Sequence, residues 1–233
     1  MIVSINQPAY MPWLGYFHRI AVSDLHITLD HVQFEKNSFT NRNKVRTATG
    51  WSWLTVPVRT GGRFGQLTIE KVEIADQGWR RKHWDTIRFA YAKAPFFAVY
   101  RDLFEDLFAR EWPLLAPLAE ATTAPLCDAL RIATRRISSA ELAVAGAKGE
   151  FVLNLCRAVG ATTYLSGPLG RGYLDPAAFQ RAGIALLFHD YRHPQYRQAF
   201  PGFEPFMAAA DLLFNHGPES TLILREGQQA LAA

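Results

Sequence analysis

2-IVSINQPAYMPWLGYFHRIAVSDLHITLD-30 opens the chain and decides its fold. Residues 2–6 form a short apolar run that predicts a buried strand, and residues 14–22 have the apolar spacing of a helix. Residues 25–29 predict a second buried strand. A strand, a helix and a second strand in this order are typical of a parallel sheet with helices on its faces. The opening stretch therefore predicts an α/β fold.

The same order of elements returns in the last third of the chain. A strand is predicted at 162–166, a helix begins at Asp175-Pro176, and a further buried strand is predicted at 184–191. Two such units predict a mostly parallel, Rossmann-like sheet with flanking helices, and sheets of this kind bind ligands outside the carboxyl ends of their strands. The loops expected to converge there are 7–16, 30–44, 166–173 and 189–198.

The middle of the chain carries two insertions. Alternating apolar residues at 51–58 and 67–74 predict a β-hairpin inserted at about 51–74. From about 77 to 137 the apolar spacing is helical, which predicts a helical subdomain. We expect residues 1–233 to form a single α/β domain that includes both insertions.

Composition limits the class of protein. The 233 residues are 49% hydrophobic and 20% charged, as in a globular protein with one good core. The N-terminus lacks the pattern of a signal peptide and no run reaches the ~18–20 apolar residues of a membrane span, so a cytosolic protein is expected.

Cys127 and Cys156 have no metal-ligand spacing and are expected to be buried free thiols. No HExxH motif or metal-binding carboxylate pair is present, so no catalytic metal is predicted.

The net charge of +4 and the pI of about 9.2 reflect basic clusters, of which 41-NRNK-44 is the most informative. Arg42 can fork onto a phosphate, and Lys44 can add a point charge beside it. Glu35 and Arg46 are expected to be solvated loop residues. The clusters suit a pocket for a phosphorylated or nucleotide-linked small molecule. No RRM, KH, helix-turn-helix or zinc-finger pattern favours nucleic acid.

Polar residues at the predicted strand ends supply the candidate chemistry. His193 follows the last buried strand and is the first choice for a general acid or base. Asp30, at the tip of the second strand, is a candidate base or orienter of a neighbouring histidine, so the predicted catalytic residues are His193 and Asp30. The residues predicted to bind substrate are Gln7, Tyr10, Trp13, Tyr16, His18, Gln33, Lys36, Asn41, Arg42, Asn43, Lys44, His83, Ser166, Arg171, Tyr196 and Asn215.

Six segments together resemble the WbqC-like family: QPAYMPWLGYFHRI, LDHVQFEKNSFTNRNKV, GWSWLTVPV, YLSGPLGRGYLD, HPQYRQ and DLLFNHGPES. The resemblance spans nearly the whole chain. This family is found with bacterial surface-polysaccharide genes, including O-antigen clusters that make amino-sugar derivatives, which implies a role in glycan precursor metabolism. The chain departs from the family pattern at His31, where a second aspartate is usual, and this leaves Asp30 as the functional carboxylate.

The opening stretch is also similar in layout to the HxGH nucleotidylyltransferases and pantothenate synthetases. Trp13 and Tyr16 stand where those enzymes have the two histidines. A tyrosine donates one hydrogen bond but carries no positive charge at neutral pH. The similarity therefore implies a nucleotidylyltransferase-like scaffold with different chemistry.

These observations predict an enzyme that transfers an acyl or aminoacyl group to the amine of a nucleotide-linked amino sugar, with a donor that the sequence does not identify. An adenylate-forming or nucleotidyl-transferring enzyme on the same fold is the first alternative. A non-catalytic binding protein of a polysaccharide assembly pathway is the second. The expected partner is a nucleotide-sugar or another phosphorylated small molecule and not a nucleic acid, and the sequence leaves homo-oligomer formation open.

Overall fold

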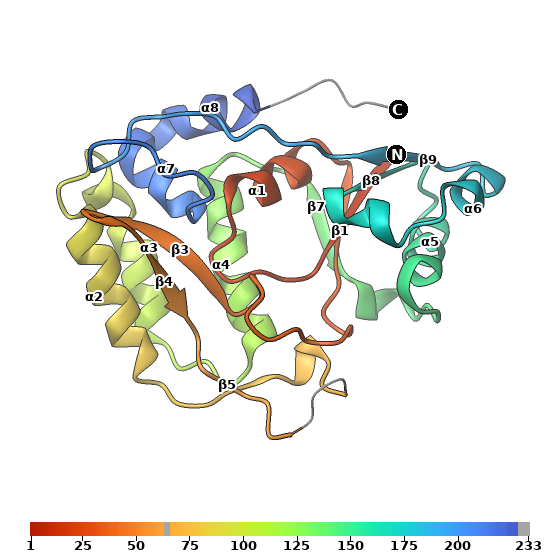
Figure 1. The fold of residues 1–233 in the computed structure, drawn as a ribbon, viewed down its shortest axis with the longest axis horizontal. Helices are drawn as coiled ribbons and strands as arrows, with labels where there is room; N and C mark the ends of the chain where they lie inside the picture. The colour runs from red at the N-terminus through yellow and green to blue at the C-terminus, as the bar shows by residue number, and fades with distance from the viewer. Residues whose placement is uncertain (63–65, 228–233) are drawn as a thin grey trace.

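The central sheet of the protein is made of five parallel strands in the order β7-β2-β1-β8-β9 (Figure 1). It is seen in a computed structural model that describes residues 1–62 and 66–227. The parallel sheet with flanking helices confirms the predicted α/β fold. The strands are β1 Ile2–Asn6, β2 Leu25–Thr28, β7 Arg135–Ser138, β8 Thr163–Ser166 and β9 Ala185–Phe188.

Helices cover both faces of this sheet. Val3 and Ile5 of β1 belong to an apolar cluster with Phe151 of α5 (Lys148–Ala158) and Phe179 of α6 (Pro176–Arg181). On the other face, the ring of Tyr16 in α1 (Leu14–Ala21) lies 5.7 Å from that of His26 in β2. Helices α1 and α6 therefore lie on opposite faces of the sheet.

The direction of the chain across the sheet reverses between β1 and β8. From β1 the chain passes through α1 to β2, on one side, whereas from β8 it passes through α6 to β9, on the other. Such a reversal is a topological switch point, and open α/β sheets bind ligands in the crevice outside the carboxyl ends of the two strands there. The topology thus directs attention to the ends of β1 and β8.

The largest apolar core lies beside the sheet and includes Phe17 of α1, Leu115 and Phe214. It is built mainly by the helices that follow the hairpin and by those at the end of the chain. These helices are α2 Trp79–Tyr91, α3 Phe97–Ala109, α4 Leu115–Ala129, α7 Ala209–His216 and α8 Ser220–Glu226. Short 3₁₀ turns lie at Ile69–Lys71, Ser139–Leu142, Pro168–Gly172 and Gly217–Glu219.

The predicted helical segment ends earlier than expected. Residues 135–138, assigned to it by sequence, instead form the edge strand β7 beside β2. Two arginines in Arg135–Ser138 hide the apolar character of a strand, and charged residues are common on exposed sheet edges.

The hairpin is present, but its predicted pairing is wrong. Strand β4 (Gly50–Thr55) pairs with β3 (Arg42–Thr47) and not with segment 67–74. The end of that segment, β6 (Glu73–Ile74), pairs with the two-residue strand β5 (Val58–Arg59), which follows β4. Two residues, 48–49, close the β3–β4 turn, and a short loop costs less closure entropy than the long one predicted. Part of that predicted turn, 63–65, lies outside the described residues.

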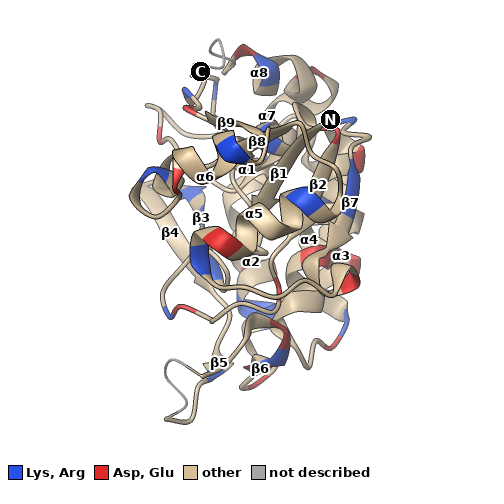
Figure 2. Ribbon diagram, turned by 90° about the vertical axis from the view of Figure 1, so that its right-hand side faces the viewer, with Lys and Arg blue, Asp and Glu red and all other residues tan. Residues whose placement is uncertain are grey.

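Charged residues of both signs are interspersed along the ribbon in the view of Figure 2. Several basic residues have acidic partners, as in the ion pairs of Arg136 with Glu120 and of Arg171 with Asp190. Arg46 is not solvated as predicted, because it is only 3% exposed. Across residues 1–62 and 66–227, none of the helices combines the length and apolar character that crossing a bilayer requires.

Candidate functional site

Polar side chains and glycine gather where the five parallel strands end. Because the strands are parallel, residues that follow different strands meet at one edge of the sheet. The residues at or just beyond this carboxyl edge are Gln7, Asp30, His31, Ser138, Ser139, Gly167 and His189.

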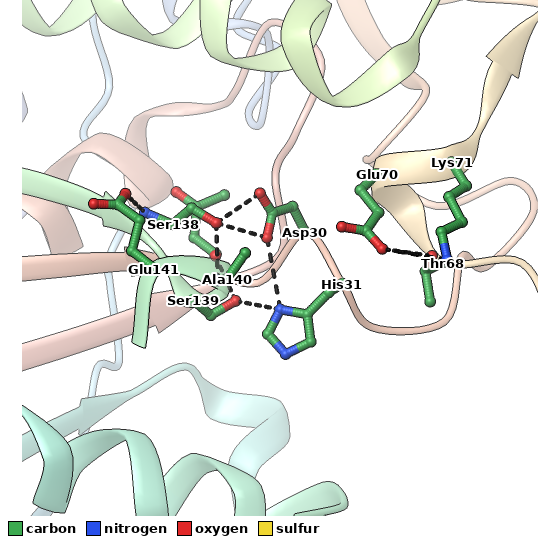
Figure 3. A network of polar contacts seen from close by, with 10 residues as sticks. Asp30, His31, Thr68, Glu70, Lys71, Ser138, Ser139, Ala140 and Glu141 are labelled. Carbon is green, nitrogen blue, oxygen red and sulfur yellow. Dashed lines mark hydrogen bonds and ion pairs between the residues drawn. The ribbon is translucent and has the colours of Figure 1, made fainter. Parts of the chain in front are cut away.

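Asp30 and His31, after β2, form a network with two serines of β7 and the turn that follows it (Figure 3). The Ser138 hydroxyl donates to the Asp30 carboxylate, with oxygen–oxygen distances of 2.8 and 2.9 Å. His31 Nδ1 lies 2.8 Å from Ser139 Oγ and 3.7 Å from Asp30 Oδ1. The histidine neighbour of Asp30 is thus His31, not His193.

The hydrogen bonds around His31 select one tautomer. The Ser139 hydroxyl donates to the Thr28 carbonyl oxygen at 3.0 Å, so the oxygen of that hydroxyl is left to accept from His31 Nδ1–H. The same proton faces the Asp30 carboxylate. This leaves the lone pair on Nε2, which is the arrangement of a general base oriented by a carboxylate. The His31 side chain is 29% exposed, so a ligand can reach it.

Local sequence holds this network in place. Ser138 caps the 3₁₀ turn Ser139–Leu142, and Glu141 completes a capping box by accepting from the Ser138 backbone N–H. On the other side, the backbone N–H of Glu70 donates to the Asp30 carbonyl oxygen. The positions of both serines and of Asp30 are therefore fixed by backbone contacts.

Arg19 of α1 reaches the switch point. The residue is 8% exposed, and a Cβ at Gly167 would collide with its Nη1 atom, so the guanidinium lies directly against the carboxyl end of β8. Burial lowers the pKa of Arg19, an effect opposed by the hydroxyls of Tyr164, Tyr16 and Tyr173. Arg19 makes no ion pair with any carboxylate of the described residues. Sequence reasoning missed it, although a charged residue on a helix expected to be buried was an available signal.

His18, a predicted substrate-binding residue, pairs with His189 beside β9. The Nδ1 of His18 lies 2.7 Å from the Nε2 of His189, and the ring of Tyr191 covers both imidazoles. Burial lowers the pKa of His18 to about 4 and that of His189 to about 3, and the charge of Arg19 also lowers the latter. Both imidazoles are therefore neutral at pH 7.

His193 lies in an aromatic enclosure, and none of its contacts is with Asp30. Its Nδ1 donates to the Pro194 carbonyl oxygen at 2.8 Å, which leaves the lone pair on Nε2. That atom is buried and has no partner among the described residues. Burial lowers the pKa of His193. The rings around it belong to Tyr191, Tyr196, Phe203 and Phe206.

The predicted cationic residues of 41–44 lie on the hairpin, against aromatic rings. Arg42 stacks over Trp53 with its Cζ 4.3 Å from the ring centroid, and Lys44 Nζ is 4.8 Å from that of Trp51. Asn41 and Asn43 are buried and donate to the carbonyl oxygens of Val56 and Met11, respectively. These asparagines hold the hairpin to its neighbours, while Arg42 and Lys44 keep a cationic, aromatic surface.

Several other predicted binding residues belong to the core. Tyr10 is fully buried and its hydroxyl lies 2.9 Å from Nδ1 of His83, whose pKa burial lowers to about 4. Tyr16 is 3% exposed, and the hydroxyl of Tyr196 donates to buried Asp211. Burial leaves these rings no face for a ligand, so they act first as structural residues.

The remaining predicted binding residues range from exposed to buried. Trp13 is partly exposed and packs on Phe39, with ring centroids 4.8 Å apart. Arg171 pairs with Asp190 and stacks over Phe188. Gln7, Gln33 and Lys36 are at least partly exposed, whereas Ser166 and Asn215 hydrogen-bond to the carbonyl oxygens of Gly167 and Asp211.

A metal site or a reactive thiol would give the described part of the chain a different chemistry. Within it, no group of three His, Cys, Asp or Glu side chains is placed to hold a metal ion. Cys127 and Cys156 are free and buried, and burial raises their pKa to about 11 and 12. Such thiols are poor nucleophiles at neutral pH.

Comparison with known proteins gives two matches of sequence. A family model described as the WbqC-like protein family matches residues 7–223. The chain is 37% identical over 229 residues to the uncharacterized protein Rv1507c of Mycobacterium tuberculosis, which covers 97% of this chain and 99% of that protein. No solved structure matches the chain, so the similarity to HxGH nucleotidylyltransferases stays a prediction.

Proposed function

The chain belongs to the WbqC-like protein family, and on this premise we propose that it transfers an acyl or aminoacyl group to the amine of a nucleotide-linked amino sugar. The reaction would serve bacterial surface-glycan synthesis, such as that of the O-antigen of lipopolysaccharide. The observation that carries the proposal is the orientation of His31 by Asp30 and Ser139 at the carboxyl edge of the sheet.

Transfer to an amine needs a base. The amine nitrogen attacks the acyl carbon of an activated donor, an N–C bond forms, and the bond between that carbon and the leaving group breaks. The proton of the amine passes to His31 Nε2 and then to the leaving group. Asp30 keeps Nδ1–H in place and stabilises the imidazolium that forms, as carboxylates do in other His-dependent transfers.

His31 is preferred to His193 as this base because of access. Aromatic rings enclose Nε2 of His193, whereas His31 is partly exposed beside Gln7 and the other strand ends. His193 is then a structural residue that packs against the rings of Tyr191 and Phe206.

Replacing His31 tests the proposal directly. Purified protein is incubated with nucleotide-linked amino sugars and activated acyl donors, and products are followed by mass spectrometry. We expect a mass gain on the sugar, with a rate reduced about 10²-fold or more in His31→Ala, since a positioned general base contributes about that factor. His216→Gln, a change to a histidine of α7 bonded to the Arg197 carbonyl oxygen, should leave the rate unchanged.

Two results would count against the proposal. One is the absence of any mass gain across a broad panel of sugars and donors. The other is a His31→Ala variant that transfers as fast as the wild type. Release of pyrophosphate from ATP or CTP would instead favour an adenylate-forming or nucleotidyl-transferring enzyme.

A further inference from the structure

Arg19 is a buried cation without a counter-charge. Arginines that are almost fully buried are normally paired, because removing an unpaired charge from water is costly. Arg19 is 8% exposed, and its Nε atom is buried with no hydrogen-bond partner in the described residues. The groups that oppose the lowering of its pKa are tyrosine hydroxyls, not carboxylates. The fold therefore keeps an uncompensated positive charge at the switch point.

Other polar atoms on α1 and on the sheet face that it covers are also unsatisfied. Buried and unpartnered atoms occur on His18 of the same helix and on Asn6 and His26 of the sheet face that α1 covers. The charge of Arg19 lowers the pKa of both His26 and His189. Both imidazoles are therefore close enough to the guanidinium to feel its charge. Buried polar groups without partners are rare in native proteins and indicate an ordered water, an ion or a ligand.

The backbone at the end of β8 is shaped around this guanidinium. Gly167 follows Ser166, the last residue of β8, and any side chain there would displace Arg19. A glycine at this position lets the guanidinium approach the strand end, where switch-point ligands bind. The positive charge of Arg19 thus lies where a switch-point ligand is expected to bind.

We propose that Arg19 anchors an anion site between the ends of β1 and β8, and that this site takes the phosphate or diphosphate of a small-molecule ligand. The planar guanidinium matches the oxygens of a phosphate with parallel N–H donors. A ligand phosphate also supplies the counter-charge that the described residues lack. The choice of a diphosphate rests on the proposed function, in which the ligand is nucleotide-linked, but the anion site itself does not.

The first test measures thermal unfolding of the full chain with inorganic phosphate, pyrophosphate or uridine diphosphate, at constant ionic strength. For the wild type we expect Tm to rise by about 5–10 °C at ~100 times the Kd of pyrophosphate or uridine diphosphate. Arg19→Met should lose this response, while Arg181→Gln, a change to an exposed arginine of α6 paired with Asp175, should keep it.

Without ligand, Arg19→Met should unfold at a Tm equal to or above that of the wild type. A buried cation kept for a ligand destabilises the unliganded fold, whereas an arginine with protein partners stabilises it. Gly167→Ala provides a second variant, because it displaces the guanidinium without removing its charge, and it should weaken binding of pyrophosphate at least tenfold.

Several outcomes would overturn the anion site. They are an unchanged pyrophosphate response in Arg19→Met, a Tm of that variant several degrees below the wild type without ligand, or a wild type that no phosphate probe stabilises. Equal stabilisation by succinate would overturn the assignment to phosphate. Transfer activity without pyrophosphate binding would reject this site alone, and pyrophosphate binding without transfer would reject the proposed function alone.

Discussion

Arg46→Met is expected to lower the free energy of unfolding by about 3–5 kcal/mol, the usual cost of breaking a buried charged network. The guanidinium of Arg46 donates to the carbonyl oxygens of Thr47, Gly50 and Pro201 and to Oε1 of Gln198. Methionine fills a similar volume, but it donates none of these hydrogen bonds, which tie β3 to the loop around Gln198 and Pro201. Urea denaturation of wild type and variant measures the difference.

The network reaches further than the hairpin that carries Arg46. Gln198 donates to the carboxylate of Asp211, which is fully buried and also accepts from Tyr196. The loss of Arg46 therefore loosens the contact between β3 and the loop before α7. Arg81→Met, at a position 92% exposed on its side chain, is the matched control and should change stability by less than about 0.5 kcal/mol. A loss below about 1 kcal/mol for Arg46→Met would contradict this account.

Arg46 and Arg19 receive the same substitution with opposite expectations. Both are buried arginines, but the guanidinium of Arg46 donates to four protein acceptors, whereas Nε of Arg19 is buried without an acceptor among the described residues. A buried arginine with its partners stabilises the fold, and one without them is kept for a ligand. Comparing the two variants without ligand thus separates a structural role from a binding role on one scaffold.

The sequence was informative where structure depends on local patterns. The opening strand, helix and strand are contiguous, so their periodicity alone predicts a parallel sheet, and the positions of Gln7 and Asp30 at strand ends follow from the same topology. The β3–β4 turn gave no signal, because residues 48–49 are Ala and Thr and lack the usual turn residues.

The parts of the site that were missed depend on contacts between distant segments. His31 becomes an oriented base only through Ser139, which is 108 residues away, and Ser139 is placed by the edge strand β7. Arg19 becomes an unpaired cation at a ligand edge only when Gly167 is brought against it. Neither arrangement can be read from spacing along the chain. The hydrophobic face of a helix predicts which residues are buried, but not which partners they meet.

Acidification is expected to unfold the protein well before its carboxylates are fully protonated. Burial lowers the pKa of His18 and His83 to about 4, and that of His26 and His189 to about 3, against about 6.5 in an unfolded chain. Between these values the unfolded chain binds protons that the folded protein excludes. The free energy of unfolding therefore falls as the pH drops below about 6.5, by about 1.4 kcal/mol per pH unit for each proton so excluded.

Asp211 works in the opposite direction, because burial raises its pKa and the folded protein then holds a proton more readily than the unfolded chain. Burial raises the pKa of Glu120 as well, and it also lowers the pKa of His193. Two carboxyl groups therefore oppose five histidines, and the histidines dominate between pH 6.5 and 4. Urea denaturation at intervals from pH 7.5 to 4.5 should show stability falling ever more steeply as the pH is lowered through 6. His26→Gln, at a position 1% exposed, should reduce that slope by about one proton. Two results would contradict this account: a free energy of unfolding that is constant from pH 7.5 to 5, or an unchanged slope in His26→Gln. Either would mean that water reaches these imidazoles in the folded protein, and with them the neighbourhood of Arg19.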